Sequence, residues 1–292
     1  MFSWPLVSTS TFRRDRENFP LARPSESQLL EIGHATRIVP AAASPSEIKI
    51  VSYNIRWRSG PELHQLAQLL QDDPEIGGAS IIGMQEVDRH KARTGKTNTA
   101  KVLAEELGMY YAWAAPPVPN SDDEEETGVL ILSAYPIADA HRIVLPHEGP
   151  EKRRRVALGA TIRVGPTSLR VYSVHSETRI PIDRKLEQMK AVLDDLARYP
   201  KEMPAVVLGD LNTWEQDAVE RTSKLFTAAN LHTPFDDQPT FSRRALFVSI
   251  DLKLDWIWLR NLGENKYGID RKIGLSDHWP LWVVIGMRTI PL

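Results

Sequence analysis

The chain has 292 residues, 42% of them hydrophobic and 25% charged, which is ordinary for a globular protein with one large domain or two small ones. Its formal net charge of −2 gives no support to a global basic field of the kind that drives nonspecific binding to nucleic acid or membranes. The absence of cysteine excludes disulfides, thiolate metal sites and cysteine nucleophiles, so any metal has to be bound by oxygen or imidazole.

Residues 1–45 are rich in Ser, Pro, Arg and Glu, and we expect them to form an N-terminal extension or surface arm, partly disordered, ahead of a domain over 46–292. The first apolar stretch is short, interrupted by Pro5 and not preceded by basic residues, so it makes a poor signal peptide. No run approaches the roughly 18 apolar residues of a membrane helix. We therefore expect a cytoplasmic protein, and a monomer.

From Ile48 onward, short apolar or alternating runs predict strands at 48–55, 80–85, 128–135, 156–164, 169–175, 205–209, 252–259 and 280–286. Leucines and other apolar residues at helical spacing predict helices near residues 63–70, 102–107 and 186–196, the second ending at Gly108. Gly165 and Pro166 separate two alternating runs, as in a hairpin turn. The pattern favours an α/β (α+β) fold of two packed mixed, largely antiparallel sheets flanked by helices.

Polar side chains follow or interrupt these predicted strands. They are Asn54, Glu86, His175, Asp210, Asn212, Asp255, Asp277 and His278. Singly, most have an ordinary structural explanation, because Asp and Asn are turn formers and a lone histidine is more often a satisfied core or surface residue than a catalyst. Asp255 is different, because it lies within an apolar run and a buried carboxylate needs a partner. Asp210 and Asn212 are two residues apart in an extended segment, which points both side chains the same way.

The ordered set resembles the endonuclease/exonuclease/phosphatase family, the deoxyribonuclease I-like phosphoesterases. The matching stretches are "SYNIRW" 52–57, "GMQEVD" 83–88, "GVLILSAYPI" 128–137, "SVHSE" 173–177, "VVLGDLNTW" 206–214, "LDWIW" 254–258 and "SDHWPL" 276–281. The resemblance implies a four-layer α/β/β/α sandwich, a catalytic domain over residues 46–292, and an active site at one edge where loops of both sheets meet.

The chemistry of phosphate esters requires such residues together, because divalent metal and hydrogen-bond donors must offset the charge of the transition state. The resemblance implies Glu86 as the principal ligand of Mg²⁺, with Mn²⁺ as a substitute, and Asn54 beside it on the metal or phosphate. Asp277 and Asp210 are candidates for a second metal position. Whether one or two ions act stays open.

A water molecule must also lose a proton. His278 is our candidate base, with Asp255 fixing its tautomer, as an acid orients an imidazole in hydrolase triads. Alternatively Asp210 orients or deprotonates the water. Asn212 would then hold the nucleophile or a nonbridging oxygen, and His175 would donate to the phosphate or protonate the leaving group.

One departure is Val129, where family members often carry Asn after the glycine. The run Arg153–Arg155 could supply a cation for phosphate instead, although such a run is more often a solvated strand edge. Trp57, Trp214 and Trp279 adjoin site motifs and either stack on a base or pack in the core. The acidic loop 121–128 would repel a long polyanion if it faces the site, and is otherwise a solvated loop.

We therefore expect a metal-dependent phosphoesterase whose substrate is a nucleic acid or a small phosphoester. A nuclease is one candidate, and a phosphoesterase for inositol phosphates or phospholipid head groups, of the sphingomyelinase kind, is the alternative. A non-catalytic binding module would be expected to lack residues such as Glu86, Asp210 or His278, and none of the matched positions is missing.

Overall fold

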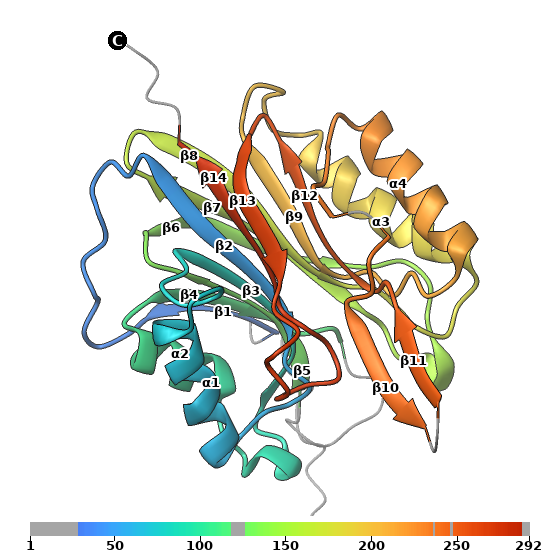
Figure 1. Cartoon of the computed structure of the whole chain (residues 1–292), viewed down its shortest axis with the longest axis horizontal. Helices are drawn as coiled ribbons and strands as arrows, with labels where there is room; N and C mark the ends of the chain where they lie inside the picture. The colour runs from blue at the N-terminus through green and yellow to red at the C-terminus, as the bar shows by residue number, and fades with distance from the viewer. Residues whose placement is uncertain (1–28, 118–125, 236, 246–247, 288–292) are drawn as a thin grey trace, which may run out of the picture.

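The computed structural model describes residues 29–117, 126–235, 237–245 and 248–287 (Figure 1). Its larger sheet has the strand order β1-β4-β5-β3-β2-β14-β13, with the bounds β1 (Leu30–His34), β4 (Tyr110–Ala114), β5 (Glu126–Ser133), β3 (Ile81–Arg89), β2 (Glu47–Asn54), β14 (Leu281–Gly286) and β13 (Glu264–Ile269). The smaller sheet has the order β12-β9-β8-β7-β6, with the bounds β12 (Asp255–Arg260), β9 (Ala205–Asp210), β8 (Thr167–His175), β7 (Val156–Val164) and β6 (Ile137–Val144).

A separate hairpin, β10 (Phe241–Ala245) and β11 (Val248–Leu252), projects from one end of the two sheets (Figure 1). The α-helices are α1 (Gly60–Asp72), α2 (Thr99–Leu107), α3 (Ile182–Leu196) and α4 (Gln216–Ala228), and the 3-10 helices are η2 (Ala92–Thr94) and η3 (Pro150–Lys152). Helix α2 ends at Gly108, which has the left-handed φ of 63° that the sequence predicts for such a stop.

Alternation along the strands explains the layers. Ile48 and Ile50 of β2 face the smaller sheet and join the core between the sheets, whereas Val51 and Tyr53 face α1 and α2. In the smaller sheet, Val171 likewise faces the inter-sheet core. The outer face of that sheet packs under α3 and α4, so the order is helices, sheet, sheet, helices (Figure 1). The predicted α/β/β/α sandwich is confirmed.

Each sheet contains one parallel pair, β2 with β3 and β8 with β9, and the chain crosses between the strands of each pair through a helix, α1 or α3. The other paired strands of the two sheets are antiparallel. Parallel strands end at the same edge of a sheet, so the residues that follow β2 and β3, and β8 and β9, lie in two adjacent groups. The mixed, largely antiparallel pairing is as predicted.

The structure differs from the sequence-based expectation in several elements, since β4, β6, β10, β13 and α4 fall outside the predicted strands and helices. Residues 30–34, placed in the arm, form β1 and pair along their whole length with β4. Their sequence, LEIGH, alternates only at Leu30 and Ile32, which is too short a run to indicate a strand. The predicted strand 252–259 is wrong as one element: Leu252 ends β11 and Asp255 begins β12. The division of the chain after residue 45 stays a prediction.

Gly209 lies directly before the end of β9 and allows the backbones of β8 and β9 to approach closely. Its φ is 134°, and an added Cβ would lie 2.1 Å from the carbonyl oxygen of Val174. We expect Gly209→Ala to lower the free energy of unfolding by about 1–3 kcal/mol, because strained backbone and overpacking both oppose it.

The measurement is urea denaturation beside Gly263→Ala, a control in which the added Cβ meets no atom within 4 Å. The control should differ from wild type by less than about 0.5 kcal/mol. Equal stability of both variants would contradict the close approach at Gly209.

Candidate active site

The polar groups converge because the strand ends are in register. His175 and Asp210 end the parallel strands β8 and β9 as register partners, and Asp255 lies opposite Asp210 at the start of β12. Asn54 ends β2 in the other sheet and donates from Nδ2 to Oδ2 of Asp210 at 3.1 Å. Both sheets therefore contribute to one group of buried side chains.

His278 lies between two carboxylates. Its Nδ1 is 2.8 Å from Oδ2 of Asp255, a hydrogen bond, and its Nε2 is 3.8 Å from Oδ2 of Asp210. Thr240 donates from Oγ1 to the same Asp255 oxygen at 2.8 Å, which fixes the carboxylate. The backbone N–H of Trp279 donates to the carbonyl of Thr240, so the base of the β10–β11 hairpin holds this loop in place.

The two carboxylates change the charge state of the imidazole. Burial disfavours the charged imidazolium, but the charges of Asp255 and Asp210 outweigh it and raise the pKa of His278 to about 10. Burial also raises the pKa of Asp210, although the positive charge of His278 opposes this shift. The two carboxylates therefore favour the imidazolium form of His278.

His175 is the second buried imidazole, and its environment has the opposite effect. Its Nε2 lies 3.5 Å from Oδ2 of Asp210, and its Nδ1 lies 3.2 Å from Nη1 of Arg155. Burial, followed by the charges of Arg155 and His278, holds the pKa of His175 well below its usual range. The surroundings thus favour the charged form of His278 and the neutral form of His175.

Three hydrogen bonds hold Asn212 in place. Its backbone N–H donates to Oδ1 of Asp210 at 3.0 Å, its Nδ2 donates to the carbonyl of Ser176 at 3.0 Å, and its carbonyl accepts from Nζ of Lys185 at 2.8 Å. Its φ of 54° is left-handed, a conformation that Asn tolerates better than most residues. The interpretation of Asp210–Asn212 as a turn is compatible with this arrangement.

The expected metal ligands lie in different surroundings. Glu86 has a φ of 59° at a bulge of β3 and follows Gln85, the register partner of Asn54. The side chain of Asp277 forms an ion pair with Arg56 at 3.0 Å, an interaction that the sequence analysis did not foresee. Glu86 therefore lies one residue beyond the partner of Asn54, within β3, which continues to Arg89, whereas Asp277 is already paired with a basic side chain.

Among the described residues, Asp210, Asp255 and His278 offer ligand atoms within 4.8 Å of one another, as a metal site requires. Oδ1 of Asp255 is buried without a hydrogen-bond partner. Oxygen and imidazole donors suit Mg²⁺ or Mn²⁺. The donor set thus fits a hard divalent ion, although Asp255 and His278 also bond to each other.

Three residues that organise the site are not predicted as such from the sequence. Lys185 and Thr240 carry no local signal, because one looks like an ordinary helix residue and the other like a loop residue. Arg155 was considered as a phosphate ligand or a solvated residue, but its side chain is buried against His175 and Glu177. Val129 is buried in the inter-sheet core, which agrees with the loss of a polar contact there.

Two of the tryptophans beside the site are exposed. Trp57 lies beneath the guanidinium of Arg93, 4.2 Å from the ring centroid, and is 36% exposed. Trp214 is 49% exposed and adjoins Lys185. Core packing therefore does not account for Trp57 and Trp214.

Most of the acidic loop lies outside the described residues, but Glu126 begins β5 and its carboxylate is buried against Arg89.

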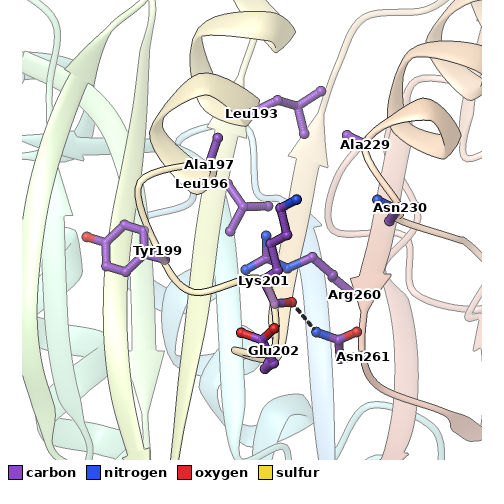
Figure 2. Close-up of a pocket in the computed structure, with 10 residues that line it drawn as sticks. All are labelled: Leu193, Leu196, Ala197, Tyr199, Lys201, Glu202, Ala229, Asn230, Arg260 and Asn261. Atoms are coloured by element: carbon purple, nitrogen blue, oxygen red, sulfur yellow. Dashed lines mark hydrogen bonds between the residues drawn. The ribbon is translucent and has the colours of Figure 1, made fainter.

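Figure 2 shows a pocket between the ends of α3, α4 and β12, lined by Tyr199, Lys201 and Asn261 among others. Asn261 follows β12, whereas Asp255 begins it. At roughly 3.3 Å per residue, the two ends of this strand are about 17 Å apart. This pocket is at the opposite end of the sheet and is separate from the polar group around Asp210.

The sandwich and its buried carboxylate, imidazole and amide groups are of the kind that hydrolases of phosphate esters use. The model of the Endonuclease/Exonuclease/phosphatase family matches residues 51–278, so the chain belongs to this family, whose members hydrolyse phosphoesters. None of the helices among the described residues is both long and apolar enough to span a membrane.

Three relatives are informative. The endonuclease/exonuclease/phosphatase from Beutenbergia cavernae superposes with a TM-score of 0.66 at 17% identity, covering 83% of this chain and 72% of that one. TDP2 from Caenorhabditis elegans superposes with a TM-score of 0.62 at 16% identity, covering 82% and 74%. Protein cwh43 of Schizosaccharomyces pombe is 28% identical over 125 residues, 42% of this chain but only 12% of its own length. The two structures share the fold with this chain.

Proposed function

We propose that this chain hydrolyses a phosphate ester by attack of water, with a divalent ion, Mg²⁺ or Mn²⁺, as cofactor. The observation that carries the proposal is the position of Asp210. Its Oδ2 accepts a hydrogen bond from Nδ2 of Asn54. The same oxygen lies 3.5 Å from Nε2 of His175 and 3.8 Å from Nε2 of His278. A carboxylate between two imidazoles can orient a water and exchange protons with its neighbours.

Each side chain has a role that its contacts support. Asp255 holds Nδ1 of His278, which leaves Nε2 as the atom that accepts or releases a proton beside Asp210. His175 donates from Nε2 to a phosphate oxygen, and Asn212 and Asn54 hold the water or a nonbridging oxygen. The hydrogen bond from Thr240 fixes the carboxylate of Asp255. Rotation of the His278 imidazole would therefore break its buried hydrogen bond to Asp255.

Glu86 and Asp210, with Asn54 beside them, would hold the ion. When bound, it would offset the charge of the phosphate oxygens and lower the pKa of a bound water. Asp277 takes part only if it leaves its ion pair with Arg56. Asp255 is the remaining carboxylate of the cluster, and its bond to His278 suits orientation of the imidazole better than ligation.

The substrate class is tested by parallel assays with plasmid DNA, single-stranded RNA, sphingomyelin and inositol phosphates, each with Mg²⁺ and with Mn²⁺. We expect hydrolysis of at least one substrate, and its loss in EDTA. A nucleic-acid substrate is supported by the exposed rings of Trp57 and Trp214, on which bases can stack. Failure on all substrates under both metals would contradict the proposed activity.

A further inference from the structure

Arg155 directly precedes β7 and lies behind His175. Its Nη1 is 3.2 Å from Nδ1 of His175, and its Nε donates to Oε2 of Glu177 at 3.2 Å. Only 14% of the Arg155 side chain is exposed. Val156, the next residue, is the register partner of His175, so the sheet itself sets the distance between the guanidinium and the imidazole.

The contact between Arg155 and His175 determines where the imidazole carries its proton. A guanidinium has N–H donors and no acceptor, so Nδ1 of His175 has to accept the hydrogen bond. A neutral imidazole that accepts at Nδ1 carries its proton on Nε2. Nε2 is the atom that faces Oδ2 of Asp210. The N–H group at Nε2 of His175 thus points toward Asp210.

We propose that Arg155 is a positioning residue that holds His175 in its Nε2–H form, as a hydrogen-bond donor to the phosphate. The catalytic part of this inference rests on the proposed function. In this arrangement His175 stabilises charge on an oxygen through a fixed donor, and the exchange of protons with water falls to His278 and Asp210.

The surroundings of Arg155 argue against direct binding of phosphate. The carboxylate of Glu177 is fully buried and accepts from Arg153, from Arg155 and from the backbone N–H of Arg179. An added Cβ on Gly149 would lie 2.5 Å from the Glu177 carboxyl carbon, so this carboxylate is packed against backbone. Glu177 therefore fixes the position of the Arg155 guanidinium. From there the guanidinium contacts His175 on the Nδ1 side of the imidazole ring.

The other two arginines of the run have different partners. Arg154 pairs with Glu148 and its side chain is 40% exposed, while Arg153 donates to Glu177, as Arg155 does. Arg154 thus serves as a matched control, because it has the same side chain in the same run but points elsewhere.

The direct test is the ¹⁵N NMR spectrum of the histidine rings in the metal-free protein, with the His175 signals assigned from the His175→Gln variant. The chain has eight histidines, so assignment is tractable. We expect Nδ1 of His175 to resonate as an unprotonated nitrogen and Nε2 as a protonated one. A proton on Nδ1 would overturn the inference, even if the chain hydrolyses every substrate offered.

The catalytic test compares Arg155→Met, Arg155→Lys and Arg154→Met on the substrate identified above. Arg155→Met should lower kcat about 100-fold with KM changed by less than about 3-fold, because the lost orientation acts on the transition state. Arg155→Lys, which keeps a charged donor, should recover part of kcat, and Arg154→Met should match wild type. Circular dichroism checks the fold of each variant.

The outcomes separate this inference from the proposed function. A rise in KM with unchanged kcat in Arg155→Met would mean that the guanidinium binds substrate directly, and would overturn the positioning role. If Arg155→Met does not fold, the kcat of Arg155→Lys and the ¹⁵N spectrum of the wild-type protein still test the positioning role of Arg155. If no substrate is hydrolysed, the spectrum tests the tautomer alone, and a mixture of tautomers would contradict the role assigned to Arg155.

Discussion

Glu86→Gln is expected to weaken the binding of divalent ions and to reduce turnover by several orders of magnitude, while leaving the fold intact. The substitution keeps the shape of the side chain but removes the charge that a hard cation needs. Glu86 is partly exposed at a bulge of β3, so the loss of its charge leaves no unpaired group in the core. The reduction in turnover should therefore follow the loss of metal affinity.

His278→Ala is the comparison that separates a metal ligand from a proton-transfer group. We expect it to abolish most activity while leaving metal affinity nearly unchanged, because the proposed ligands of the ion are Glu86, Asp210 and Asn54; a large loss of affinity would instead make His278 a ligand, together with Asp210 and Asp255. The measurement is metal titration by calorimetry together with hydrolysis of a chromogenic phosphodiester. Glu220→Gln, the same change on the exposed surface of α4, serves as control. Full activity in EDTA, or wild-type affinity and turnover in Glu86→Gln, would rule out a metal-centred mechanism through Glu86.

Asp255→Asn should lower turnover by about 10² to 10⁴-fold, because the carboxylate both orients His278 and stabilises its positive charge. Asn keeps the size of the side chain, so the packing beneath Thr240 survives. We also expect the double variant Asp255→Asn, His278→Ala to be no slower than His278→Ala, since residues that act as a unit are not additive.

The same chromogenic assay measures this cycle, with Asp217→Asn as control. Asp217 lies on α4, where its exposed carboxylate pairs with Arg221, and its loss should change turnover by less than about 2-fold. Additive losses in the double variant would mean that Asp255 and His278 act separately, and would remove the pair from the mechanism.

The sequence alone was sufficient to identify the family and, through that resemblance, the fold, whereas the composition of the site stays a prediction. Alternating runs such as 48–55 and 169–175 identify strands, because a residue on a strand faces one sheet surface or the other with a period of two. The order of the motifs, from "SYNIRW" to "SDHWPL", placed polar residues at strand ends. Residues 30–34 escaped prediction because their alternating pattern spans only Leu30 to Ile32, and the strand forms by pairing with β4.

Only the tertiary structure decided which of these groups touch. Spacing along the chain does not reveal that Asp277 pairs with Arg56, that Arg155 faces His175 or that Lys185 holds the carbonyl of Asn212. Each of these contacts depends on how strands and helices from distant parts of the chain are placed against one another. Local sequence determines the direction of each side chain from its own strand, but the partner it meets depends on the register and packing of two sheets, and these are set by the whole core.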